Sequence, residues 1–236
     1  MFAAIALFAT WIVLGLPGAL IFFPWTLISG DVTPLYRYAM GVVRIGLRVA
    51  GIRVQAEFRA ALSPARPCIF LSNHVSNLDP PVLFPLLPGR ATAFLKRSLM
   101  KIPVLGYGMR LADFIPVDRD GRVESAVESV DTAARVLASG VHILSFVEGT
   151  RSRDGRLQPF KKGPFYLAEN TGAPVVPVSV FGTETMMKKG SLRIYPGTAH
   201  VIFHAPLLPR DYATREDLMA AVRDTIASGL PEWMRG

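Results

Sequence analysis

Two things are scarce in this 236-residue sequence: cysteine along its whole length, and charge at its beginning. The single cysteine, Cys68, excludes an intrachain disulfide and a four-cysteine zinc site, and its place in the apolar run PCIFLS predicts a buried, inert thiol. A Gly-x-Ser-x-Gly sequence is missing, which excludes the nucleophile elbow of serine hydrolases. Acidic residues are outnumbered, 18 against 26 basic ones, and the net charge of +8 favours nucleic acid, an anionic membrane surface or a phosphate-bearing substrate as partner.

No residue from Met1 to Gly30 has a charged side chain. The run FAAIALFATWIVLGLPGALIFFPWTLIS is longer than the roughly 20 residues with which a helix crosses hydrocarbon, so we expect it to lie in a membrane. Pro17 and Pro24 would kink or split a helix, which leaves open both a straight span and a hairpin within one leaflet. A buried core helix is the alternative. A cleaved signal peptide is not expected, because no basic residues precede the run and no cleavage site follows it.

Basic residues begin directly after this apolar run, at Arg37, Arg44, Arg48 and Arg53. By the positive-inside tendency they predict that the following region lies on the cytoplasmic face of the cell inner membrane. Thr33 and Pro34 predict the start of a helix that ends near Gly51 and lies along the membrane surface. The predicted organisation is therefore a membrane anchor with an interfacial helix at residues 1–50, followed by a single domain at residues 51–236.

Short β-rich runs alternate with helical or turn-rich segments through the second part of the chain. They are IRVQAE from residue 52, PCIFLS from 67, ATAFL from 91, DFIPV from 113, VHILSFV from 141, VVPVSVF from 175 and AHVIFH from 199. This alternation predicts an α/β fold in which helices flank a mixed β-sheet.

Two of the intervening helices have capping-box spacing at their predicted starts, Ser125 with Glu128 and Thr214 with Asp217. The first helix should end at Gly140 and pack on the sheet through Val127, Val130, Ala134 and Leu137. The second should pack through Leu218, Ala221, Val222 and Ile226.

His74 and Asp79 are the first pair of residues that indicates chemistry. They lie in LSNHVSNLDPP after a predicted buried strand, at a spacing that does not align two side chains on a helix. In a loop, the Asp79 carboxylate can fold back onto one imidazole nitrogen, so that the other accepts a proton from a substrate hydroxyl. The alternative, compatible with the first, is that Asp79 caps a helix beginning at Pro80. The remaining histidines are expected to be structural, at positions His142, His200 and His204.

A second candidate site follows the predicted strand that ends at Val147. The sequence there breaks into Glu148, Gly149, Thr150 and Arg151. Backbone amides freed at such a turn, together with a guanidinium, suit an anionic phosphate. More basic residues follow, at Arg153, Arg156, Lys161 and Lys162. Taken alone, this stretch is more typical of a solvated basic loop than of a binding site.

Together these segments resemble the glycerophospholipid acyltransferases, the family of the 1-acyl-sn-glycerol-3-phosphate (lysophosphatidic acid) acyltransferases. NHVSNLD is similar to the family's first motif, FIPVDR at residues 114–119 to its second, FVEGTR to its third and VVPVSV to its fourth, in the expected order. The segment FLKRSLMKIPVLG also resembles a family segment with a lysine, here Lys96.

The resemblance implies an O-acyltransferase of phospholipid biosynthesis. It would move an acyl group from acyl-CoA or an acyl carrier protein to the sn-2 hydroxyl of lysophosphatidate, giving phosphatidate, although another lysolipid such as a lyso-aminolipid would leave the same motifs. His74 would be the base and Asp79 its partner, with no cofactor and no metal. Pro177 would shape the acyl side, and the other substrate-binding residues implied are Lys96, Arg119, Glu148, Gly149, Thr150 and Arg151.

Three departures from the family pattern are present. Ser98 stands where an acidic residue is common, Val147 replaces a proline, and Ala112 with Asp113 replaces a glycine-led approach to the second motif. None is a proton-transfer group, so they bear on loop shape and acceptor choice.

Two rival functions remain to be considered. A hydrolase is the nearest rival enzyme, but the sequence offers no candidate for its nucleophile. The rival from another class is a non-catalytic membrane or nucleic-acid binder. Aromatic residues are not interleaved with the basic run around Arg151 in the manner of stacking platforms, so the lipid bilayer is an expected partner and nucleic acid is not.

Overall fold

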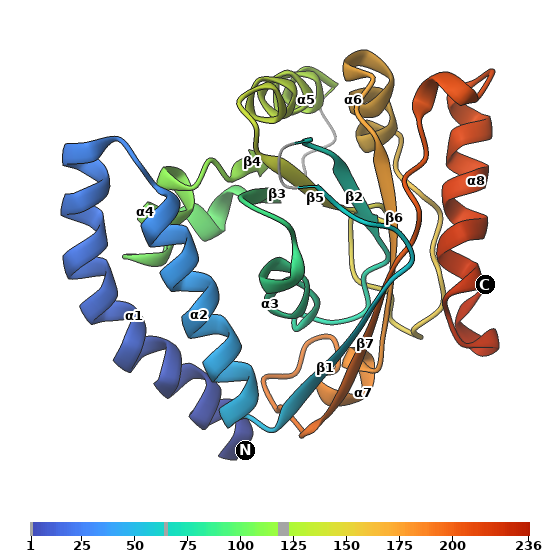
Figure 1. Cartoon of the computed structure of the whole chain (residues 1–236). Helices are drawn as coiled ribbons and strands as arrows, with labels where there is room; N and C mark the ends of the chain where they lie inside the picture. Colours follow the sequence, from blue (N-terminus) through green and yellow to red (C-terminus); the bar gives the residue numbers. More distant parts are fainter. Residues whose placement is uncertain (1, 64–65, 118–122) are drawn as a thin grey trace.

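The computed structural model describes residues 2–63, 66–117 and 123–236, with the backbone alone for residues 123–126. A seven-stranded sheet in the order β1-β7-β6-β2-β5-β3-β4 forms its centre (Figure 1). The strands are β1 (Ile52–Phe58), β2 (Ile69–Ser72), β3 (Ala91–Lys96), β4 (Ile115–Val117), β5 (His142–Phe146), β6 (Val175–Phe181) and β7 (Gly197–Phe203). From β6 to β4 the neighbours are parallel, whereas β6 and β7 are antiparallel, so the sheet is mixed, as predicted.

Helices cover both faces of this sheet (Figure 1). One face carries α1 (Phe2–Ser29), α2 (Thr33–Val49) and α3 (Asp79–Leu83), and the other carries α5 (Val123–Ala138), α6 (Gly163–Thr171) and α8 (Arg215–Ser228). The shorter helices are α4 (Leu105–Leu111) and α7 (Thr183–Met186), and 3₁₀ turns occur at Phe84–Leu86, Arg97–Lys101, Pro209–Asp211 and Glu232–Met234.

The central strands are buried on both faces, which explains their continuous apolar sequences. In β2, Phe70 packs in the apolar cluster beneath α2 and α3, whereas Ile69 and Leu71 pack in the cluster beneath α5, α6 and α8. Alternate residues of one strand therefore supply two separate cores. Cys68 precedes this strand as a buried free thiol, as predicted.

α1 is one continuous helix of 28 residues that runs through both Pro17 and Pro24. The hairpin within residues 2–29 that two prolines allow is therefore not formed. By length and composition α1 is able to cross a membrane, and only 17% of its most apolar window is buried. Side chains such as Leu20 and Ile28 are 79% and 87% exposed, so the alternative of a buried core helix is wrong and membrane association is indicated.

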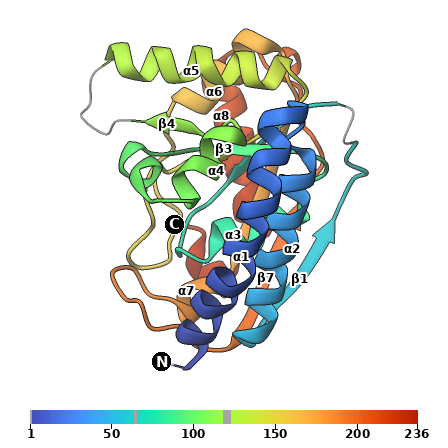
Figure 2. The same ribbon diagram turned by 90° about the vertical axis from the view of Figure 1, so that its left-hand side faces the viewer.

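α2 returns along α1, and the two helices lie side by side (Figure 2). Their backbones approach closely at two glycines, because a Cβ at Gly18 would collide with the Tyr38 ring and one at Gly46 with the Trp11 indole. The Tyr38 hydroxyl also donates a hydrogen bond to the Leu14 carbonyl at 2.8 Å, in the turn before Pro17. The absence of a side chain at Gly18 and Gly46 thus permits this helix pair.

Hydrogen bonds also fix α2 to the sheet and to the segment after α3. The Tyr36 hydroxyl accepts from the Ala91 amide at 3.2 Å, and the Arg44 guanidinium donates to the Pro85 carbonyl. Leu35 and Leu47 of the same helix are buried. α2 is therefore an integral part of the folded domain.

Two predicted element starts were wrong. The helix assigned to a Ser125–Glu128 capping box begins at Val123, so Ser125 lies inside it. The strand predicted from Asp113 begins at Ile115, because Asp113 adopts a left-handed conformation (φ +61°) that ends any extended pairing before it. The capping box of Thr214 and Asp217 is confirmed, with both of its hydrogen bonds formed at the start of α8.

The helix pair gives a test with a matched control. Alanine at Gly41 of α2 meets no atom within 4 Å, and it should be neutral or stabilise the protein by up to about 1 kcal/mol through helix propensity. Gly46→Ala places a methyl group against Trp11 and should lower the free energy of unfolding by about 1 to 3 kcal/mol. Denaturant unfolding of both variants in detergent measures the difference; equal stability of the two would contradict this packing.

Candidate active site

The candidate residues gather at the carboxyl ends of the parallel strands, where ligands bind in open α/β sheets. His74 follows β2, residues 148–151 follow β5, and Lys96 is the exposed last residue of β3. Arg119 lies outside the described residues. Pro177 is the exception. It is buried within β6, where it pairs with Leu71 of β2, and Leu71 precedes His74 by three residues. The structure therefore does not place Pro177 at this edge of the sheet.

A hydrogen bond joins His74 to Asp79, as the loop spacing predicted. The imidazole Nδ1 lies 2.7 Å from the Asp79 Oδ2, and residues 73–78 between β2 and α3 are not helical. The amides of Val75 and Ser76 donate to the same oxygen at 2.8 Å each. Because a carboxylate oxygen accepts, Nδ1 carries the proton in this arrangement.

The other imidazole nitrogen, Nε2, remains available. It has no hydrogen bond to any described residue, and 15% of the His74 side chain is exposed. The ring stacks on Phe146, the last residue of β5, with ring centroids 3.9 Å apart and planes at 20°. Phe146 and Asp79 together orient the imidazole, with Nδ1 toward the carboxylate and Nε2 without a partner among the described residues, which is the arrangement that a general base requires.

Asp79 does not act as the predicted helix cap. Its carboxylate accepts only from groups outside α3: His74 Nδ1, the two loop amides that precede it and the Thr183 hydroxyl, which donates to Oδ1. α3 has no side-chain hydrogen bond at its N-terminus. The Asp79 side chain is fully buried, so these donors replace the water that it loses on folding.

Glu148 contacts the backbone of His74. Its side chain is 2% exposed, and its Oε1 accepts from the His74 amide at 3.2 Å, whereas Oε2 has no partner among the described residues. Burial raises the pKa of Glu148 to about 8, so its carboxyl group holds a proton at neutral pH. The next residue, Gly149, has a φ of +69°, which permits the turn away from β5.

The loop after β5 also binds the other side of His74. The Ser152 amide donates to the His74 carbonyl at 2.8 Å, so Glu148 and Ser152 hold both backbone groups of the candidate base. Between them lie Thr150, which is exposed, and Arg151, which is half-buried. No described residue pairs with the Arg151 guanidinium. The two predicted sites are therefore one site, with a cation free to meet an anionic ligand.

Comparison with known proteins identifies the family. A model of the family described as Acyltransferase matches residues 53–181, more than half of the chain. The chain belongs to this acyltransferase family. A chloroplastic 1-acyl-sn-glycerol-3-phosphate acyltransferase of Brassica napus is 39% identical over 168 residues, which are 70% of this chain and 46% of that protein. The chain thus spans under half the length of this relative.

Other relatives of this acyltransferase are covered more fully. A 1-acyl-sn-glycerol-3-phosphate acyltransferase of Limnanthes douglasii is 30% identical over 88% of this chain and 73% of its own length. The human 1-acyl-sn-glycerol-3-phosphate acyltransferase alpha is 31% identical over 72% of this chain and 60% of its own. The crystal structure of the acyltransferase PlsC from Thermotoga maritima, 24% identical, covers 98% of this chain and 94% of its own with a TM-score of 0.81, which shows the same fold.

Several residues of the acyltransferase site were not identified from the sequence. Thr183 binds Asp79, Phe146 stacks on His74, and the Lys189 ammonium donates to the Arg151 carbonyl at 2.7 Å. The Ser76 hydroxyl donates to the Met187 carbonyl in the same segment after α7. Only Phe146 had a sequence signal, since it is the first residue of the FVEGTR motif and lies on a predicted strand.

The raised pKa of Glu148 makes stability depend on pH. The folded protein binds a proton at Glu148 up to about pH 8, whereas an unfolded glutamate loses it near 4.5. This contribution to stability is complete below pH 4.5 and is lost as the pH rises to about 8, by up to about 1.4 kcal/mol per pH unit. Glu148→Gln should flatten the unfolding free energy between pH 5 and 8, measured by denaturant titration. Equal slopes for wild type and variant would exclude a proton held at Glu148.

Lys189 provides a test of how the Arg151 loop is positioned. Lys189→Met keeps the aliphatic stem but removes the hydrogen bond to the Arg151 carbonyl, so the acceptor KM should rise about threefold to tenfold while kcat changes little. Lys188→Met is the matched control, because Lys188 is exposed and its ammonium has no partner in the described part of the chain. A fall in kcat alone, or equal effects in both variants, would contradict a positioning role.

Proposed function

We propose that this acyltransferase transfers a fatty acyl group from a thioester donor to the sn-2 hydroxyl of 1-acyl-sn-glycerol-3-phosphate, giving phosphatidate. The observation that carries the chemistry is the His74 imidazole, with Nδ1 bound to buried Asp79 and Nε2 free. The acceptor is inferred from the names of the relatives and from Arg151, whose guanidinium has no partner among the described residues and which precedes the residue that binds the His74 carbonyl.

In the proposed reaction, His74 Nε2 accepts the proton of the sn-2 hydroxyl while the hydroxyl oxygen attacks the thioester carbonyl carbon. A new C–O bond forms, and the C–S bond breaks as the tetrahedral intermediate collapses. The thiolate leaves with its electron pair and takes up the proton from the His74 imidazolium. The chain needs no acyl-enzyme for this route, because the base acts directly on the acceptor.

The acceptor phosphate is assigned to the basic groups at the same edge of the sheet. Arg151 has both terminal guanidinium nitrogens available for a bidentate contact, and Lys96 at the end of β3 adds a second positive charge. Anchoring the phosphate holds the hydroxyl at His74 and lowers the entropy cost of the bimolecular step. We assign Arg119, Gly149 and Thr150 to the same ligand by their places in the family motifs.

We further propose that the acyl donor is acyl-CoA or an acyl carrier protein, and that the enzyme works at the cytoplasmic face of the cell inner membrane. α1 supplies the apolar surface for this membrane. α2 lies along α1 and carries Arg37, Arg44 and Arg48, so lipid cannot surround α1 at that side. Insertion of α1 into one leaflet is therefore favoured over a span across both.

The test is acyl transfer from labelled acyl-CoA to lysophosphatidate by the detergent-solubilised protein. His74→Ala should lower kcat by about 10² to 10⁴-fold or more, because general base assistance is lost. Arg151→Ala should raise the acceptor KM by about tenfold to a hundredfold through loss of a charge-assisted contact. If wild type forms product with a lyso-aminolipid and not with lysophosphatidate, the proposed acceptor is wrong, whereas the proposed acyl transfer with His74 as base still holds.

Two matched control variants distinguish loss of a catalytic or binding group from a general effect of the substitution on packing or charge. The His200 imidazole stacks on Phe181 with ring centroids 4.7 Å apart, as His74 does on Phe146, so His200→Ala removes a similar packing contact without a catalytic nitrogen. Arg156→Ala removes a charge from the same loop as Arg151. Both should keep activity within a few-fold. Activity of His74→Ala equal to that of His200→Ala would eliminate His74 as the base.

A further inference from the structure

A second basic cavity lies away from His74, between α2, β1 and the segment that follows α3. Its volume is about 680 Å³, and none of its lining residues belongs to the site described above. Three are arginines: Arg44 and Arg48 from α2, and Arg53 from β1. The others are apolar or glycine, namely Leu47, Gly51, Ile52, Val54, Val82, Pro85, Leu86 and Pro196. The lining thus combines positive charge with hydrocarbon and contains no acidic side chain.

The charges of this cavity are not balanced by the protein. Arg44 uses one donor on the Pro85 carbonyl, and the guanidiniums of Arg48 and Arg53 have no partner among the described residues. Arg44 and Arg48 are four residues apart on α2, a spacing at which like charges repel. The negative end of the α2 dipole favours one positive charge near Arg48 but does not account for three. An anionic ligand would remove this repulsion.

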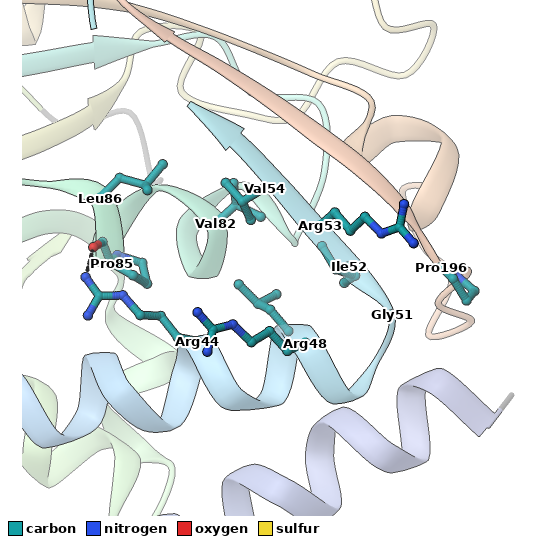
Figure 3. A pocket seen from close by; sticks show the side chains of 11 residues that line it. Arg44, Arg48, Gly51, Ile52, Arg53, Val54, Val82, Pro85, Leu86 and Pro196 are labelled. Atoms are coloured by element: carbon teal, nitrogen blue, oxygen red, sulfur yellow. Dashed lines mark hydrogen bonds between the residues drawn. The ribbon is translucent and has the colours of Figure 1, made fainter. Parts of the chain in front are cut away.

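The arrangement of side chains separates a polar end from an apolar floor. The Arg44 and Arg48 side chains extend along α2 in the same direction, with Val82, Val54 and Leu86 on the opposite wall, and Arg53 extends the other way toward Pro196 (Figure 3). A phosphate at Arg48 would meet the remaining donors of Arg44 as well. Glycerol and the first methylenes of an acyl chain would then cover the valine and leucine side chains.

The position of the cavity indicates where such a ligand comes from. α2 forms one wall, and the other side of α2 packs on α1, the apolar helix that contacts lipid. A cavity of this size holds a headgroup with part of a chain. We propose that it binds the phosphate of an anionic membrane phospholipid other than the acceptor, and that this contact seats the enzyme on anionic membranes. The binding does not depend on the acyl transfer proposed above.

The experiment measures binding of dihexanoyl phosphatidylglycerol to the purified full chain by calorimetry, below the micelle concentration of the lipid. Wild type should bind it at least tenfold more tightly than dihexanoyl phosphatidylcholine. The double variant Arg48→Gln/Arg53→Gln should weaken phosphatidylglycerol binding by about tenfold or more. Arg37→Gln/Arg210→Gln removes the same charge from exposed positions outside the cavity and should change binding less than threefold.

Two more variants make the result specific. Leu86→Trp fills the apolar part of the cavity and should weaken lipid binding while the arginines remain. His74→Ala should bind phosphatidylglycerol as wild type does, so failure of the proposed acyl transfer would leave this result intact. The proposal is overturned by equal losses in the two charge variants, by inorganic phosphate binding as tightly as the lipid, or by loss of acyl transfer to saturating lysophosphatidate in Arg48→Gln/Arg53→Gln.

Discussion

The buried carboxylate of Asp79 is the contact on which the geometry of the active site depends. A carboxylate withdrawn from water is unfavourable unless donors surround it, and here four donors do: His74 Nδ1, two loop amides and the Thr183 hydroxyl. These bonds give the segment after β2 its irregular path and join it to Thr183, the first residue of α7. The orientation of the imidazole is therefore a consequence of satisfying one buried charge, and loss of any one donor would disturb the others.

A second set of contacts makes the base and the basic loop a single unit. Glu148 and Ser152, from the loop after β5, bind the amide and the carbonyl of His74, and the Lys189 ammonium donates to the carbonyl of Arg151 in the same loop. Parallel strands make this possible, because β2, β5 and β6 end at the same edge of the sheet. Glu148 takes part in these contacts as a buried, protonated carboxyl group, so it adds no negative charge beside the basic residues to which we assign the acceptor phosphate.

The features predicted correctly from the sequence are those that depend on residues close together in the chain. The strands, the Thr214 cap and the His74–Asp79 pairing each depend on residues within about one turn or one loop of each other. Thr183 lies 104 positions from Asp79 and Lys189 lies 38 from Arg151, so no window of sequence relates them. The contact of Glu148 was missed for the same reason, since burial is a property of the tertiary fold. Ser125 had the spacing of a cap, but α5 starts two residues earlier, and spacing alone does not fix where a helix begins.

The apolar helix α1 is connected to the candidate active site through α2. This helix packs on α1 at Gly18 and Gly46, accepts from the Ala91 amide at the start of β3 through Tyr36, and donates through Arg44 to the segment after α3. α3 begins at Asp79, the partner of the base. Close packing and hydrogen bonds therefore connect the apolar helix to the candidate base through α2, so the depth and angle at which α1 would enter a bilayer also set the height of His74 above it.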